Sequence, residues 1–317
     1  MYAAADVSLV GTFAKLADRT AVPGALPPRL NEDPSLYGHL TSGLDLTIGC
    51  EGYSDTRSLD SRFHSIFDYL CKTSQLSSSF KETIGADFLL TRKCLVDIGQ
   101  AAYRAESTRI QAIRKKGVIF MCEIRKEYPS QPFGHKFEQY LTLNDRGLPH
   151  DKYERLTNDG CSKAVFRTTF TSGNKAIKVF YAAEMDAIDE ERNFVELKTT
   201  SMSHDRWVQI ASLSNYLQSF FGKIPYIICG RKPSFGNNVI YQVDKIQTAD
   251  IPNYSGVHWK KEVCFQQIFN VLNAVKSRLQ QDNEAVVFNL TQGTIYLETE
   301  RAENCTFTDQ AFLNYLN

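Results

Sequence analysis

Three strand-like segments follow one another closely in the middle of the chain. Residues 163–172, 175–189 and 193–200 are rich in β-branched and aromatic side chains, and Gly173-Asn174 between the first two is a turn signal. Strands joined by such short connections usually pair as antiparallel neighbours. The pattern therefore predicts an antiparallel meander, around which the rest of the chain must pack.

The flanking sequence predicts helices on both sides of this meander. Apolar side chains recur at helical spacing within 59–73, 96–116, 204–221 and 259–281, and Gly222 stands where a helix-ending glycine would. The apolar run after Pro225 predicts a buried strand, and residues 286–299 predict a hairpin. Residues 1–60 are rich in Pro, Gly and Asp, and we expect them to be irregular with short extended pieces.

No low-complexity stretch or evident linker divides the 317 residues. We therefore expect one domain over residues 1–317, with residues 1–60 packed on it. Its class is α+β, with a mixed, largely antiparallel central sheet, or more than one such sheet, flanked by helices.

The net charge limits the kinds of binding partner that we expect, and the cysteine content indicates the cellular compartment. Lys plus Arg and Asp plus Glu each number 36, so the formal net charge is zero. Proteins that coat nucleic acid without specificity are usually basic, so any RNA site should be a local pocket or channel. The eight cysteines form no CxxC pair, the first 19 residues lack the features of a signal peptide, and no apolar run has membrane-spanning length. We expect an intracellular protein with reduced thiols and no membrane segment.

Four charged residues on the predicted strands suggest chemistry. Residues i and i+2 of a strand share a face, so Glu184 would project with Asp186, and Glu196 with Lys198. If the two strands are neighbours, all four side chains meet on one face. Uncompensated burial of such charges is very costly, and carboxylates around an open site suit Mg²⁺ or Mn²⁺. The alternative is a solvated strand face whose alternating charges point into water.

Three residues outside this pair of strands fit the same site. Glu138 follows an apolar stretch that we expect to be extended, and Arg92 follows an apolar strand-like run. Arg is a natural bidentate phosphate ligand, although a surface ion pair is its commoner role. Gln218 lies on the helix expected after the Lys198 strand, where it can contact phosphate or water, or can be a polar residue at the rim.

The order of these motifs resembles that of known nucleases. A carboxylate followed by E-x-K is typical of the PD-(D/E)xK group. The chain more closely resembles the DXO family of RNA 5′-end decapping and exonuclease enzymes, from about residue 7 to about residue 300. The similarity rests on Arg92, G-φ-x-φ-E at 134–138, E-φ-D at 184–186, E-φ-K at 196–198 and the helix with Gln218. The chain departs from the family pattern at His135, usually apolar or aromatic, and after Gly230, where an aromatic is common.

The resemblance implies a role for each site residue. Glu138, Asp186 and Glu196 would bind one or two Mg²⁺ or Mn²⁺ ions directly, together with the backbone carbonyl of Leu197, and Glu184 would bind directly or through water. Lys198 and Gln218 would orient the nucleophilic water and the scissile phosphate, and Arg92 would hold an RNA phosphate.

The resemblance also implies a substrate and a setting. Family members hydrolyse RNA 5′ ends that are incompletely capped, triphosphorylated or NAD-capped, and some continue as 5′–3′ exoribonucleases. We expect a monomer that acts on single-stranded 5′ ends in RNA quality control, in the nucleus rather than the cytoplasm. Two alternatives stay open. One is a PD-(D/E)xK nuclease acting on DNA, which the 134–138 and Arg92 matches disfavour. The other is an interaction protein that binds and stabilises a 5′–3′ exoribonuclease.

Overall fold

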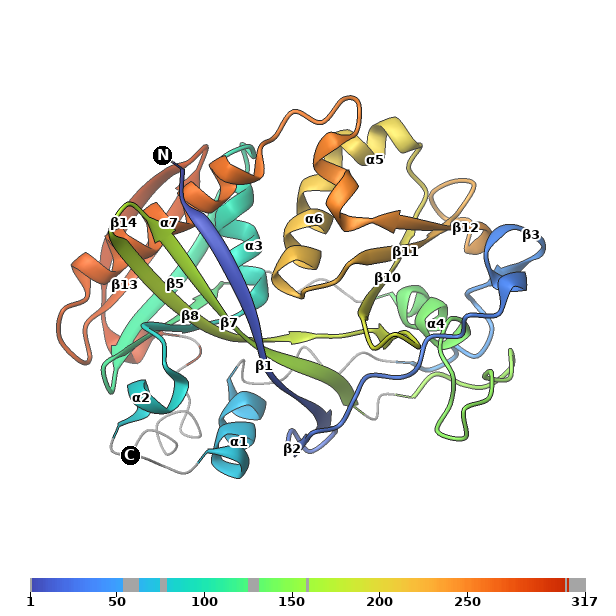
Figure 1. Ribbon diagram of the computed structural model, residues 1–317, viewed down its shortest axis with the longest axis horizontal. Helices are drawn as coiled ribbons and strands as arrows, with labels where there is room; N and C mark the ends of the chain where they lie inside the picture. Colours follow the sequence, from blue (N-terminus) through green and yellow to red (C-terminus); the bar gives the residue numbers. More distant parts are fainter. Residues whose placement is uncertain are drawn as a thin grey trace.

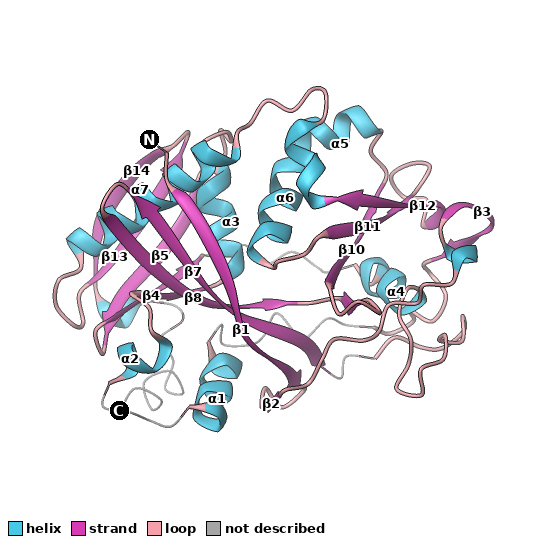
Figure 2. Cartoon of the chain, viewed as in Figure 1, coloured by secondary structure: helices cyan, strands magenta, loops and turns pink. Residues whose placement is uncertain are grey.

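The computed structural model describes residues 2–53, 63–74, 79–124, 131–157, 160–305 and 307. Its strands form two sheets that lie side by side, with helices packed on and between them (Figures 1 and 2). The nine-stranded sheet has the order β14-β13-β5-β6-β4-β8-β7-β1-β2, and the five-stranded sheet has the order β3-β12-β11-β10-β9. This confirms the predicted α+β class with largely antiparallel sheets.

The larger sheet comprises β1 (Ala4–Leu16), β2 (Ala21–Pro23), β4 (Phe88–Leu90), β5 (Thr108–Lys115), β6 (Val118–Glu123), β7 (Gly160–Ser172), β8 (Lys175–Glu184), β13 (Ala285–Thr291) and β14 (Thr294–Glu300). The smaller sheet comprises β3 (Gly38–Asp45), β9 (Ala187–Ile188), β10 (Phe194–Thr200), β11 (Tyr226–Arg231) and β12 (Val239–Gln247). The α-helices are α1 (His64–Thr73), α2 (Phe80–Ile84), α3 (Arg92–Gln100), α4 (Phe133–Tyr140), α5 (His204–Ile210), α6 (Ser212–Phe221) and α7 (Lys261–Arg278).

The larger sheet is buried on both faces because its side chains alternate. In β8, Val179 and Tyr181 join the core that includes residues of α3, α6 and α7, whereas Phe180 joins the core that includes residues of α1. The predicted hairpin at Gly173-Asn174 is confirmed, since Ser172 pairs with Lys175 across the turn. The predicted helix at α7, the buried strand β11 and the hairpin β13–β14 are confirmed as well. Of the helix predicted over 59–73, the described part is α1.

The smaller sheet packs α4 on one of its faces. Val195 and Leu197 of β10 share a core with Phe137 of α4. A Cβ on Gly230 of β11 would lie 2.7 Å from the Phe137 ring, so glycine is what lets the helix approach this closely. The opposite face of β10 therefore turns toward α3 and α6.

The predicted meander is wrong beyond its first hairpin. β8 ends at Glu184, and Ala187–Ile188 then forms β9 in the other sheet, where it pairs with β10. The N–H of Met185 still donates to the carbonyl of Ser162 beside the larger sheet, and the chain crosses between sheets immediately afterwards. Residues 175–189 are thus two strands, and β8 and β10 are not neighbours.

The prediction of a helix over 96–116 is wrong past Gln100. Residues 108–115 form β5, which pairs with both β6 and β13. The side chains of this segment alternate, because Ile110 and Ala112 enter one core and Ile113 enters the other. This segment pairs with a strand on each side and buries both of its faces. These long-range contacts favour a strand, although the local spacing of apolar residues also fits a helix.

Two other predictions need correction. Residues 204–221 form two helices that meet at Ala211, and Gly222 has right-handed backbone angles while Lys223 takes the positive φ of 51°. Residues 1–60 are less irregular than expected, since the 13-residue β1 pairs along its length with β7. No helix among the described residues is long and apolar enough to cross a membrane.

Candidate active site

Glu196 is the centre of the candidate site. It lies on the face of β10 opposite Leu197, and only 2% of it is exposed. Its Oε1 accepts a hydrogen bond from Gln218 Nε2 of α6 at 2.5 Å and forms an ion pair with Lys198 Nζ. Its Oε2 lies 3.6 Å from Arg92 Nη1 at the start of α3. The structure therefore brings Arg92, Lys198 and Gln218 onto one buried carboxylate.

The start of α3 is held in place by a residue that sequence reasoning missed. Thr91 caps α3, because its hydroxyl oxygen accepts from the N–H of Cys94 at 3.0 Å. The same hydroxyl donates to the buried carboxylate of Glu123 at 2.7 Å. The threonine before Arg92 was the available signal, since threonine is a favoured residue at a helix start. This capping orients Arg92, which follows the buried strand β4 as predicted.

Arg92 also joins α3 to the end of α6. Its Nη1 donates to the carbonyl of Gln218 at 3.5 Å, and a Cβ on Gly222 would lie 3.1 Å from that same nitrogen. Gly222 follows the last residue of α6, as predicted, although its backbone angles are right-handed. The lack of a side chain at Gly222 lets Arg92 approach closely at this point.

Asp186 approaches the site from the crossing between the sheets. Its Oδ2 accepts a hydrogen bond from the N–H of Leu197 at 2.8 Å. The N–H and C=O of one strand residue point to the same side of the strand, so the Leu197 carbonyl also points toward this edge of β10. Among the described residues of β10, only Phe194 and Val195 pair with β9, which leaves the rest of this edge open beside Asp186. The predicted use of the Leu197 carbonyl as a ligand fits this arrangement.

Glu138 comes from a helix and not from the extended stretch that we predicted. It lies on α4, its side chain is 28% exposed, and its Oε2 is 3.3 Å from His135 Nδ1. The fully buried Lys136 anchors this helix by donating to the carbonyls of Lys152 and Glu154, each at 3.0 Å. Glu138 can reach the open edge of β10 because α4 packs on the Leu197 face of that strand.

Glu184 occupies a different position from the one predicted. It is half-buried at the end of β8, in register with Lys163 of the larger sheet. It therefore does not share a strand with Asp186, and its strand is not a neighbour of the one that carries Glu196.

The charges of the site act strongly on one another. Burial raises the pKa of Asp186 well above its usual range, and the charges of Glu196 and Glu138 raise it further. Burial alone would raise the pKa of Glu196, but Lys198 and Arg92 outweigh it and lower that pKa. Burial alone would lower the pKa of Lys198, but Glu196 and Asp186 raise it and keep the amine charged. The site thus holds a charged lysine and a carboxyl group that resists ionisation.

These residues fit a hard divalent cation. Glu196 Oε2 is buried without a hydrogen-bond partner, and mutual repulsion among three carboxylates opposes ionisation of Asp186. A cation would relieve both, and oxygen donors are what Mg²⁺ and Mn²⁺ prefer. Among the described residues, no group of three or more Asp, Glu, His or Cys side chains forms a ready-made metal site. Each acid instead has its own protein partner, so the carboxylates would have to turn from Leu197, Gln218 and His135 to share an ion.

Comparisons with known proteins identify relatives of the chain and structures with a similar fold. The chain is 27% identical over 267 residues to the decapping nuclease dom-3 of Caenorhabditis elegans, covering 77% of this chain and 67% of that protein. It is 25% identical over 203 residues to the decapping and exoribonuclease protein Rai1 of Drosophila melanogaster, covering 53% and 52%. The fold resembles that of Scheffersomyces stipitis Rai1 in complex with (3′-NADP)⁺ and a calcium ion, with a TM-score of 0.76, 15% identity and coverage of 99% and 97%. It also resembles Candida albicans Rai1 in complex with pU5-Mn²⁺, with a TM-score of 0.70, 15% identity and coverage of 98% and 96%.

The family model described as RAI1-like PD-(D/E)XK nuclease matches residues 15–313. That range contains both sheets' central strands and every residue of the candidate site. The chain belongs to the RAI1-like PD-(D/E)XK nuclease family.

Proposed function

We propose that this chain is a divalent-metal-dependent hydrolase that cuts phosphate-ester or pyrophosphate bonds at the 5′ end of RNA. The observation that carries this proposal is the convergence of Arg92, Lys198 and Gln218 on Glu196 beside Asp186. The family and the relative named as a decapping nuclease support it, as does the similar Rai1 solved with pU5 and Mn²⁺.

The protein's own groups supply charge and position. Arg92 and Lys198 are cations and Gln218 is an amide donor, and an anionic phosphate would compete with Glu196 for all three. Lys198 is 34% exposed, so it can reach a substrate while Glu196 holds it. A divalent ion held by Glu138, Asp186, Glu196 and the Leu197 carbonyl would supply Lewis acidity and a more acidic bound water. Reactions at phosphorus depend mainly on such positioning and charge stabilisation.

We also propose the finer features of substrate and setting. The substrate is a single-stranded 5′ end, since the candidate site centres on a carboxylate that is only 2% exposed and the chain has no net positive charge to favour duplex binding. NAD caps are included, since a similar Rai1 was solved in complex with (3′-NADP)⁺ and a calcium ion. The ion is Mg²⁺ or Mn²⁺, and another similar Rai1 was solved with pU5 and Mn²⁺. A monomer acting in the nucleus, with a 5′–3′ exoribonuclease as partner, completes the proposal. Size-exclusion chromatography and tagging in cells test these last points.

One assay tests the activity. The protein is incubated with RNAs that carry a triphosphate, an unmethylated cap, an NAD cap or a monophosphate, with Mg²⁺ or Mn²⁺, and the released products are resolved. We expect pyrophosphate, cap or nucleotide products that disappear with a chelator and with the Asp186→Ala variant. A DNA strand of the same sequence is the control for the alternative nuclease. Equal cleavage of DNA, or no product from any RNA, would overturn the proposal.

A further inference from the structure

One face of the smaller sheet carries Glu196 and Lys198, and we call it the catalytic face. This face continues beyond Lys198. Residues that pair across a sheet share a face, and Lys198 pairs with Cys229 while Thr200 pairs with Arg231. The second pairing continues across the next strands, from Arg231 to Gln242 of β12 and from Gln242 to His39 of β3. These strands lie side by side, with β3 beyond β12 (Figure 1). A row of polar side chains therefore runs across the sheet two residues beyond the catalytic lysine.

Neighbouring side chains hold the guanidinium of Arg231, one member of this row, in place. Arg231 Nε forms an ion pair with Asp244 Oδ2, and Gln242 Nε2 donates to Asp244 Oδ1 at 2.6 Å. The Arg231 side chain is 16% exposed, so it is not closed off from solvent. The ring of His39 meets that of Tyr241 edge-on, with centroids 6.4 Å apart, and both residues are exposed.

The loop that follows Arg231, between β11 and β12, carries an exposed aromatic ring. The N–H of Lys232 donates to the carbonyl of Thr200 at 2.8 Å, which ties the loop to the end of β10. Phe235 follows three residues later and is 97% exposed, more than any other large hydrophobic side chain that the structure describes. A single exposed apolar residue is ordinary. This one follows two cations in the sequence, Arg231 at the end of β11 and Lys232 directly after it, and exposed aromatic rings combined with cations are typical of single-strand binding surfaces.

The loop lies close to the reacting groups. Lys198 and Thr200 are about 7 Å apart along β10, since a strand rises about 3.3 Å per residue. The three residues from Lys232 to Phe235 span at most about 11 Å. A few nucleotides of a single strand cover this distance.

We propose that Phe235, Arg231 and Lys232 bind the RNA nucleotides that follow the scissile bond. Phe235 stacks on a base, and the two cations contact backbone phosphates. The inference rests on the proposed function, because it takes Lys198 as the position of the scissile phosphate. Stacking and phosphate contacts do not depend on sequence, which suits an enzyme that must accept any RNA body.

Binding without cleavage tests the role of the ring. Fluorescence anisotropy in EDTA is measured with 5′-phosphorylated, 3′-labelled oligouridylates of two and ten nucleotides. Phe235→Ala should weaken binding of the ten-nucleotide RNA about fivefold or more, with a smaller loss for the two-nucleotide RNA. Phe235→Trp should restore binding and Phe235→Leu should not. Because Phe235 makes little packing contact, the fold should tolerate all three changes. Tyr296→Ala, at an exposed aromatic on β14, is the matched control.

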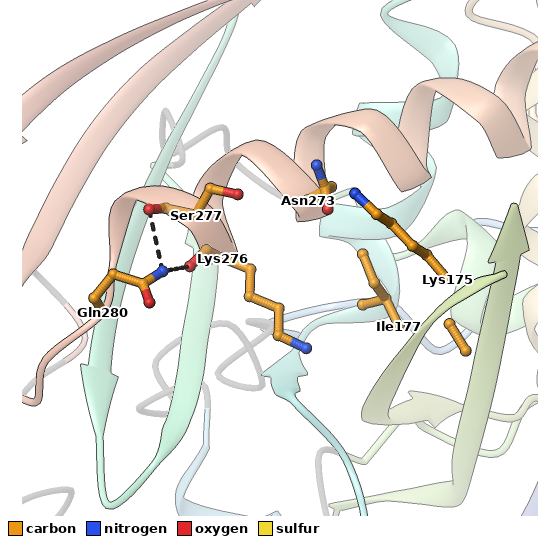
Figure 3. Close-up of a pocket in the computed structure, with 7 residues that line it drawn as sticks. Lys175, Ile177, Asn273, Lys276, Ser277 and Gln280 are labelled. Carbon is orange, nitrogen blue, oxygen red and sulfur yellow. Dashed lines mark hydrogen bonds between the residues drawn. The ribbon is translucent and has the colours of Figure 1, made fainter. Parts of the chain in front are cut away.

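Salt dependence tests the cations. Loss of one phosphate contact in Lys232→Ala should lower the slope of log K against log salt by about 0.7. The matched control is Lys175→Ala, in a separate 290 Å³ pocket between β8 and α7 (Figure 3). Lys175 is nine residues from Glu184 along β8, far from the catalytic face.

The outcomes separate this inference from the proposed function. If wild type cleaves the ten-nucleotide RNA with Mn²⁺ but Phe235→Ala binds it normally, the inference fails and the function stands. If Phe235→Leu binds as wild type does, the contact is not base stacking and the inference fails. If Phe235→Ala weakens binding of the two-nucleotide and ten-nucleotide RNAs equally, Phe235 lies on the 5′ side of the scissile bond and the inference fails. RNA binding that needs Phe235, without any cleavage, would reject the proposed function.

Discussion

Replacing Asp186 by Asn should stabilise the metal-free protein. Burial and the charges of Glu196 and Glu138 raise the pKa of Asp186, so its ionised form is disfavoured in the folded state. Such a carboxyl contributes fully to stability below its unfolded pKa of about 3.9 and loses that contribution as pH rises through its folded pKa. As pH rises above the unfolded pKa, the wild-type protein carries a growing penalty for ionising this group, whereas Asn carries none. Asn can still accept the 2.8 Å hydrogen bond from Leu197.

The size of the effect follows from linkage. Each tenfold change in the acid dissociation constant corresponds to about 1.4 kcal/mol of unfolding free energy. For a chain of this length, about 1 kcal/mol moves the melting temperature by roughly 2 °C. We therefore expect the Asp186→Asn variant to melt at a higher temperature than wild type at pH 8 in EDTA. The difference should be about 3 °C for each tenfold change in the acid dissociation constant of Asp186 between the unfolded and folded states, and it should vanish near pH 4. Mn²⁺ at a hundred times its Kd should stabilise wild type by about 2.7 kcal/mol and the variant far less.

Asp189 offers a matched control three residues away. Burial alone would raise the pKa of Asp189, but hydrogen bonds from Asn193 and Tyr226 outweigh it and lower that pKa. Asp189→Asn should therefore melt lower than wild type at pH 8 and keep its full response to Mn²⁺. Scanning calorimetry of both variants at pH 4 and pH 8, with EDTA or Mn²⁺, makes the comparison. An Asp186→Asn protein that melts lower than wild type at pH 8 in EDTA would refute a destabilising charge at this position. Equal stabilisation of the variant and wild type by Mn²⁺ would refute a role for Asp186 in binding the ion.

Three other predictions follow from the site. Lys198→Ala should lose roughly 10²–10⁴ in rate while still binding Mn²⁺ in calorimetry, because we propose that the lysine acts on charge at the phosphate and does not bind the metal; near-normal turnover would contradict that role. Gly230→Ala should destabilise the protein by about 1–3 kcal/mol and weaken Mn²⁺ binding, since its Cβ would lie 2.7 Å from Phe137 on the helix that carries Glu138. Gly134→Ala on the same helix, where a Cβ meets nothing within 4 Å, is the control, and equal unfolding curves for the two would contradict the packing argument. Blunt duplex RNA should be cut far more slowly than single-stranded RNA, and equal rates would contradict a recessed site.

Local periodicity was sufficient for the parts of the site that lie on one element. Glu196 and Lys198 share a face of β10 because they are two residues apart on a strand, and this needs no knowledge of the partner strands. The hairpin at Gly173-Asn174, the helix that carries Gln218 and the strand before Arg92 were predictable for the same reason. In each case neighbouring residues decide the conformation.

Only the tertiary structure decided which of these elements meet. Residues 108–115 have spacing that also fits a helix, and pairing with β6 and β13 makes them a strand. The chain crosses from the larger to the smaller sheet after Glu184, where β8 stops pairing with β7 and β9 starts to pair with the edge of β10. No local pattern marks this point, so our prediction wrongly assigned Asp186 to the same strand as Glu184. Glu138 reaches the site from a helix because Phe137 packs against Gly230, about ninety residues further along. Sequence alone therefore indicated which side chains we propose carry the chemistry. Long-range pairing and packing, which no local pattern encodes, determined how they converge on Glu196.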